Sequence, residues 1–178
     1  MIFSKKNTTA DAVKSLTRMA LIAAAYTAVT LILLPISYGT VQLRIAEAFC
    51  VLPAVFPEAV PGLFVGCLVS NLISPNPLLL DVIVGSLTTL ASAFLARLLR
   101  RHPFLVPLPA VILNAVLVAL VLTFSLSGAQ SDSFGTVYFF NMLSLLISQT
   151  IVCCGIGYPL LFVLRKLEKK GIYPFHQS

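Results

Sequence analysis

The chain has 178 residues, of which 58% are hydrophobic and only 10% are charged, with a formal net charge of +6. A soluble domain needs about a quarter of its residues charged to wet its surface, so this composition excludes a water-soluble globule. In lipid every backbone polar group must be paired internally, which leaves helices or a closed barrel. Long apolar runs without polar alternation favour helices, so we expect an all-α membrane protein.

Six apolar segments in chain order are predicted to form the membrane bundle: residues 15–34, 44–55, 60–73, 79–99, 104–126 and 134–164. Pro53, Pro57 and Pro61 lie around the junction of the second and third segments, so residues 44–73 form either two short spans or one long kinked span. The first segment could also be a cleaved signal peptide. Its apolar stretch is long, however, and no small-x-small cleavage site follows it.

The positions of lysine and arginine favour six spans, because cytoplasmic loops concentrate these residues. With the N-terminus inside, groups of four, three and four of the twelve cations face the cytoplasm, and only Arg44 lies outside. A single span over residues 44–73 would instead place Arg97, Arg100 and Arg101 outside. We therefore predict a multi-pass plasma-membrane protein with both termini cytoplasmic: a cytoplasmic segment 1–14, a six-helix bundle 15–165 and a cytoplasmic tail 166–178.

Polar side chains inside the bilayer are costly, and each therefore suggests a function. Seven of them map to the outer half or the midplane of the predicted spans: Arg44, Glu47, Asn71, Asp81, Asn114, Asn141 and Gln149. This clustering predicts a ligand pocket that opens away from the cytoplasm, although hydrogen bonds between helices are the alternative. Arg44 and Glu47 lie three residues apart on one helical face, which allows them to pair.

Residues 35–42 connect the first two segments and are expected to lie above this pocket. Tyr38 offers a flat ring that could cover or stack on a ligand, and Gly39 offers a hinge. An interfacial aromatic anchor is the alternative role for Tyr38.

Small residues recur every four positions on two segments. Ala20, Ala24 and Ala28 lie on the first, and Gly62 and Gly66 lie on the third. In lipid, such spacing lets another helix approach closely. The pattern predicts either packing within the bundle or a docking surface for a second membrane protein.

No motif of a catalytic or metal site is present. The sequence lacks a G-x-x-x-x-G-K-[ST] phosphate loop and an H-E-x-x-H motif, and its two histidines lie in polar flanks. The four cysteines lack metal-ligand spacing: Cys50, Cys67, Cys153 and Cys154. We therefore expect no enzyme activity, no metal and no cofactor in this chain.

Five motifs, in order, resemble the QueT family of substrate-binding (S) components of energy-coupling factor (ECF) transporters for queuosine precursors. They are residues 41–48 (VQLRIAEA), 61–67 (PGLFVGC) with Asn71, Asp81 with 85–87 (GSL), 107–109 (PLP) with Asn114 and Ala115, and 157–160 (GYPL). The resemblance covers residues 38–160, most of the chain.

The resemblance implies a six-helix subunit that captures a deazaguanine base at the outer face. Its partners would be a transmembrane coupling protein and two cytoplasmic ATPases, which use the ATP, and it would bind no nucleic acid. It implies docking of the coupling protein on Ala20 and Ala24, continued by Ala28, and a lid formed by residues 35–42. With the polar residues above, the predicted substrate site comprises Tyr38, Gln42, Arg44, Glu47, Asn71, Asp81, Asn114, Asn141 and Gln149.

One departure from the family pattern concerns the substrate. The last span usually carries Gly-Glu where this chain has Ser148-Gln149, and an amide cannot neutralise a cationic aminomethyl group. The identity of the precursor therefore stays open. The alternatives are an S component for another flat vitamin, thiamine- or riboflavin-like, or a ligand-free membrane structural or assembly protein.

Overall fold

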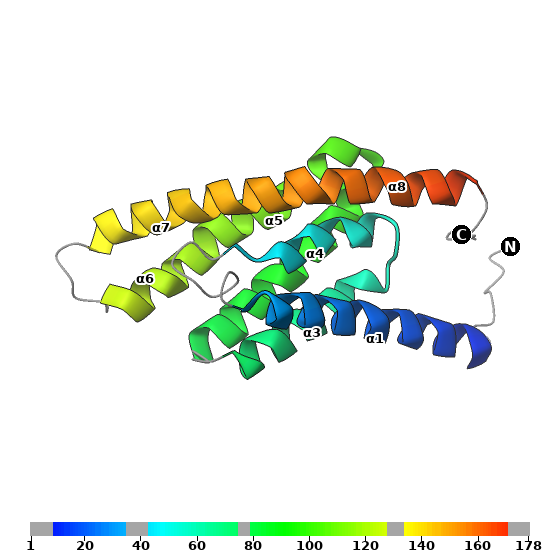
Figure 1. Ribbon diagram of the computed structural model, residues 1–178, viewed down its shortest axis with the longest axis horizontal. Coiled ribbons are helices and arrows are strands. Elements are labelled where there is room, and N and C mark those ends of the chain that lie inside the picture. Colours follow the sequence, from blue (N-terminus) through cyan, green and yellow to red (C-terminus); the bar gives the residue numbers. More distant parts are fainter. Residues whose placement is uncertain (1–8, 35–42, 75–78, 128–133, 171–178) are drawn as a thin grey trace, which may run out of the picture.

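The computed structural model describes residues 9–34, 43–74, 79–127 and 134–170, and all structural statements below concern these residues. Within them the regular structure is entirely helical, and no strand is found. The longer helices run roughly along one common axis (Figure 1). The prediction of an all-α protein is thus confirmed for the described part of the chain.

The helices follow the predicted segments and are interrupted by short 3-10 and π stretches. The first three elements are α1 (Thr9–Ile32), the 3-10 helix η1 (Ile45–Ala54) and α3 (Ala59–Ile73). The next two helical segments consist of η2 (Asp81–Gly85), α4 (Ser86–Leu98) and η3 (Leu99–Arg101), then η4 (Pro103–Leu105), α5 (Leu108–Leu113), η5 (Asn114–Val118) and α6 (Ala119–Ser127). The last consists of α7 (Phe134–Gln149), η6 (Thr150–Ile156) and α8 (Gly157–Lys169).

Four of the six predicted segments are long and apolar enough to cross a membrane: Thr9–Ile32, Asp81–Arg101, Pro103–Ser125 and Phe134–Lys169. The other two, η1 and α3, are shorter apolar helices. At about 2.0 Å and 1.5 Å per residue each extends roughly 20 Å, less than the ~30 Å hydrocarbon core. The predicted six segments are all helical, but only four qualify as spans by length.

η1 is short because of where proline falls, and it occupies the centre of the molecule. Pro53 lies inside it, and the chain turns directly afterwards, with the Phe56 amide donating to Leu52 O at 2.8 Å. Ala46 and Val51 are completely buried, and η1 contacts α1, α4, α8 and η6. Gly157 of α8 comes so close that a Cβ there would lie 3.1 Å from Val51 Cγ1. Small residues therefore let the surrounding helices close around η1.

The two small-residue patterns have opposite surroundings. Gly66 of α3 faces α1 so closely that a Cβ would lie 2.9 Å from both Ala23 O and Tyr26 Cβ. Gly62 packs against α1 in the same way, and Thr27 Oγ1 donates to Gly66 O at 3.1 Å. By contrast, the three alanines of α1 that were predicted to dock a partner are all exposed: Ala20, Ala24 and Ala28. The glycines thus serve packing within the bundle, and the alanines face outward.

The start of α1 and the end of α8 lie at one end of the bundle (Figure 1), and the cations of α4, η3 and α8 line a common pocket. There Arg18 pairs with Glu58 at 3.5 Å, Arg97 donates to Pro53 O at 3.2 Å, and Arg165 donates to Arg100 O. The basic groups of α1, of α4 with η3, and of α8 therefore share one end. That this end faces the cytoplasm stays a prediction from the positive-inside rule.

Candidate functional site

A buried polar cluster lies toward the end of the bundle that is opposite the basic residues. Arg44 Nη2 donates to Asp81 Oδ2 and to Asn71 Oδ1, both at 3.1 Å. Asn71 Nδ2 donates in turn to the Asp81 backbone oxygen at 3.3 Å. The Arg44 and Asp81 side chains are only 6% and 13% exposed, so water screens this ion pair weakly. Three of the predicted site residues are thus brought into one network.

Helix ends bring this cluster together. Arg44 directly precedes η1 in an extended conformation, Asn71 lies in the last turn of α3, and Asp81 opens η2. Gly85, one turn after Asp81, has no side chain and so leaves space for the Asn71 and Asp81 side chains. A Cβ at Gly85 would lie 3.1 Å from Asn71 Nδ2 and 3.3 Å from Asp81 Oδ1. A side chain at position 85 would therefore crowd the polar network.

Glu47 is buried in the first turn of η1, whereas Arg44 lies just before this helix in an extended conformation. Its carboxylate accepts a 2.6 Å hydrogen bond from the Tyr26 hydroxyl, whereas Arg44 forms its ion pair with Asp81. Sequence reasoning missed Tyr26. A signal for it existed, because a phenolic hydroxyl in the middle of an apolar span needs an acceptor.

The interior beside Glu47 holds a small cavity of about 10 Å³, which has room for roughly one water. Its lining comes from α1, η1, α3 and α4: Tyr26, Glu47, Cys50, Leu63, Thr89, Ser92 and Ala93. This cavity is too small for a base. Glu47 is therefore enclosed between α1 and η1 and is already bonded to a protein partner.

The remaining predicted amides have three different surroundings. Gln149 is buried, and its Oε1 lies 3.4 Å from Cys153 Sγ, which is also 3.5 Å from the backbone oxygen of Glu47. Asn141 Nδ2 donates to Thr123 Oγ1 at 3.1 Å and joins α7 to α6, which is the interhelical bonding considered above as the alternative. Asn114 is 4% exposed.

Three of the polar residues coincide with the three π segments of the described chain. Asp81 is the first residue of η2, Asn114 is the first residue of η5, and Gln149 directly precedes η6. A π turn adds a residue to the helical turn, redirects nearby side chains, and occurs frequently at functional sites. Hydropathy patterns carry no signal for this change of hydrogen-bond register, so the sequence did not predict it.

Asp81 Oδ1, which belongs to this network, and Asn114 Nδ2, at the start of η5, are buried and have no hydrogen-bond partner among the described residues. A buried polar atom left unpaired costs about 1–3 kcal/mol, so such atoms call for an explanation. One is a carboxylate acceptor and the other an amide donor. Asp81 Oδ1 can accept a hydrogen bond from a ligand N–H, and Asn114 Nδ2 can donate one to a ligand carbonyl.

Two predicted site residues, Tyr38 and Gln42, and the predicted lid 35–42 lie outside the described residues.

Helices with apolar outer surfaces around a buried charged cluster define a multi-pass membrane protein. The family model described as "QueT transporter" matches residues 16–166. The chain therefore belongs to the QueT transporter family, which confirms the predicted resemblance. It is a transporter component and not an enzyme, as predicted. A search of curated proteins and a search of solved structures each found no match.

Proposed function

We propose that the chain is the substrate-binding component of an ECF-type importer. It captures a queuosine precursor, a deazaguanine base, at the face opposite the basic end and delivers it to a transmembrane coupling protein and two cytoplasmic ATPases, which use ATP. Membership of the QueT transporter family supports the transport role. The predicted six-span fold, with both chain ends cytoplasmic, belongs to the same proposal and is supported by the gathering of basic residues at one end.

The unpaired atoms of Asp81 and Asn114 are the observation that carries the proposal. A deazaguanine presents ring N–H and exocyclic amine donors beside a carbonyl acceptor. Asp81 Oδ1 can accept from such an N–H, and Asn114 Nδ2 can donate to the carbonyl. Because Arg44 holds Asp81 Oδ2 at 3.1 Å, the carboxylate is already oriented before the ligand arrives. A ligand of this kind would relieve both unpaired groups.

Within the predicted set, the structure favours Asp81 over Glu47 as the carboxylate that contacts substrate. Glu47 already accepts from Tyr26 at 2.6 Å and adjoins a cavity with room for about one water. We infer that Glu47 holds η1 against α1, and that it supports the site from behind.

The outward alanines of α1 support docking of a coupling protein. Only 17% of the most apolar stretch of α1 is buried, against 33–50% in the other three long helices. Ala20, Ala24 and Ala28 are all exposed on this helix. Close approach of a second helix there would bury a face that the bundle leaves open.

Calorimetric titration of the purified chain with deazaguanine tests the proposal. We expect Asp81→Asn to weaken binding at least tenfold, because the ligand loses a charge-assisted bond and Arg44 loses its counter-charge. Glu58→Gln is the matched control, since it makes the same chemical change in a carboxylate that pairs with Arg18 at the basic end. Unchanged affinity in Asp81→Asn, or an equal loss in both variants, would contradict the assigned site.

A further inference from the structure

A second polar pocket lies at the basic end, away from the Asp81 cluster. Its volume is about 350 Å³, within the range of roughly 300–1,000 Å³ usual for ligand sites. The lining comprises Ala54, Val55, Arg97, Arg100, Arg101, Arg165, Glu168 and Lys169. Five cations face a single carboxylate there, so the lining carries a formal charge of +4. This charge favours an anionic ligand.

The fold positions these cations from two segments far apart in sequence. Arg97 at the end of α4 donates to Pro53 O at 3.2 Å and to Ala54 O at 3.4 Å, where η1 ends. Arg165 of α8 donates to the backbone oxygen of Arg100. Two guanidinium groups are thus fixed by carbonyl oxygens. Holding like charges together is unfavourable unless a counter-anion joins them, so the arrangement is prepared for one.

Exposed aromatic and apolar side chains lie on the same elements as the cations of this pocket, or close to them in the chain. Phe104 stacks edge-on with Tyr158 and with Phe162, at centroid distances of 5.9 Å and 6.1 Å. Phe104 and Phe162 are exposed, as is Leu98, the residue next to Arg97. Of the three aromatic residues, Tyr158 is of a residue type that is enriched at membrane–water interfaces. The pocket therefore lies where apolar surface gives way to charge.

We propose that this pocket binds the phosphate headgroup of an anionic phospholipid. Guanidinium groups bind phosphate in a bidentate manner, and basic pockets between helices on the cytoplasmic side of membrane proteins bind anionic headgroups. The proposal does not depend on the identity of the transported ligand. It assigns the cations of α4, η3 and α8 a binding role in addition to setting topology.

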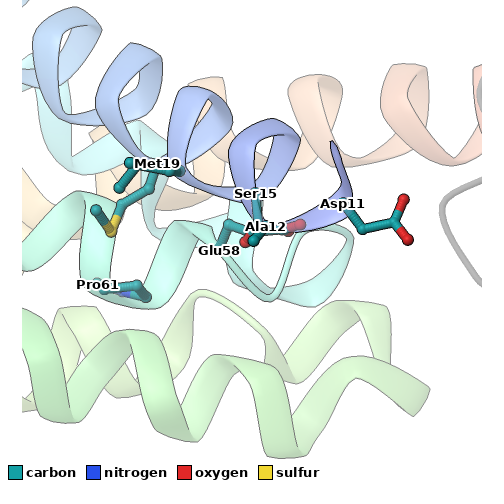
Figure 2. A pocket seen from close by; sticks show the side chains of 7 residues that line it. Asp11, Ala12, Ser15, Met19, Glu58 and Pro61 are labelled. Atoms are coloured by element: carbon teal, nitrogen blue, oxygen red, sulfur yellow. The ribbon is translucent and has the colours of Figure 1, made fainter. Parts of the chain in front are cut away.

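A neighbouring hollow offers an internal comparison. It has a volume of about 470 Å³ and lies between the start of α1 and the start of α3 (Figure 2). Its lining is Asp11, Ala12, Ser15, Leu16, Met19, Glu58 and Pro61, with two carboxylates and no cation. This hollow is larger but has the wrong charge for a phosphate. Size alone therefore does not single out the basic pocket.

Native mass spectrometry of the full chain in a neutral detergent tests the proposal, with titration of phosphatidylglycerol and phosphatidylcholine. We expect phosphatidylglycerol to bind at least tenfold more tightly. The double variant Arg101→Gln with Lys169→Gln removes two exposed charges from the pocket lining. It should lower the affinity for phosphatidylglycerol roughly tenfold or more. The charge-keeping pair Arg101→Lys with Lys169→Arg should retain binding and so exclude a folding defect.

The control is Lys14→Gln with Lys166→Gln, which removes the same charge at exposed positions outside the pocket lining and should change affinity less than twofold. An equal loss of phosphatidylglycerol affinity in the two glutamine double variants would show that only the net charge of the protein matters. That result would overturn the proposal. Glycerol phosphate or inorganic phosphate binding as tightly as the lipid would show a site for soluble phosphate instead. Absence of any preference for phosphatidylglycerol over phosphatidylcholine would overturn the proposal.

Discussion

At the scale of single residues, the candidate site combines polar atoms that have hydrogen-bond partners in the protein with polar atoms that have none in the described chain. Arg44, Asn71 and Glu47 have protein partners at hydrogen-bonding distance, whereas Asp81 Oδ1 and Asn114 Nδ2 have none in the described chain. Sequence could locate these residues because a polar side chain stands out in an apolar run. It could not tell Asp81 from Glu47, because that distinction depends on Tyr26, which lies 21 residues before Glu47.

Gly85→Ala tests the fine geometry of this cluster. The new Cβ would lie 3.1 Å from Asn71 Nδ2 and 3.3 Å from Asp81 Oδ1, so both side chains must shift by a few tenths of an ångström. We expect several-fold weaker deazaguanine binding in titration calorimetry, with little change in melting temperature, since Gly→Ala in a helix contributes up to about 1 kcal/mol of stabilisation. Gly155→Ala is the control, because no atom lies within 4 Å of its Cβ. Equal affinities of both variants would show that Asp81 and Asn71 tolerate displacement without loss of recognition.

At the scale of elements, the predicted segments and the observed helices agree in position but differ in kind. Apolar runs locate helices because hydropathy reports burial in lipid. They do not report hydrogen-bond register, so neither the 3-10 geometry of η1 nor the π segments η2, η5 and η6 were predictable. Small-residue spacing was similarly ambiguous. Gly62 and Gly66 pack inside the bundle and Ala20, Ala24 and Ala28 face out, although their sequence spacing is the same.

Ala24→Leu tests the outward face of α1 as a docking surface. The residue is exposed, so leucine should leave the fold and deazaguanine binding intact, while it blocks close approach of a partner helix. Co-purification with the coupling protein and ATPases should fall severalfold. Gly66→Ala gives the contrasting outcome, because its Cβ would meet Ala23 O at 2.9 Å and should lower the melting temperature of the isolated chain. Loss of ligand binding in Ala24→Leu with an intact complex would make Ala24 an internal packing residue.

At the scale of the whole molecule, the bundle has two chemically different ends. One end carries the cations of α1, α4, η3 and α8 around a pocket of about 350 Å³, and the Arg44–Asp81 cluster lies toward the other. This difference between the two ends was predictable from the spacing of lysine and arginine along the chain. It matches the demands of an importer, in which substrate enters on one side and ATP-driven partners act on the other.

Labelling of a single cysteine at position 101 tests the orientation of the bundle. In a variant without the four native cysteines, a membrane-impermeant thiol reagent added to intact cells should leave Arg101→Cys unmodified, because η3 lies at the basic end. Permeabilised cells should show efficient labelling. Modification in intact cells would place the basic end outside and reverse the proposed topology.

The central claim is that this membrane protein captures a deazaguanine base. Mass spectrometry of small molecules released on denaturing the purified chain tests it most directly, with the Asp81→Asn variant purified in parallel. We expect a deazaguanine to be released from the wild-type chain in near-stoichiometric amount and to be lost from Asp81→Asn, because that carboxylate holds the unpaired acceptor. Release of a thiamine- or riboflavin-like molecule, or of no small molecule after incubation with deazaguanine, would contradict it.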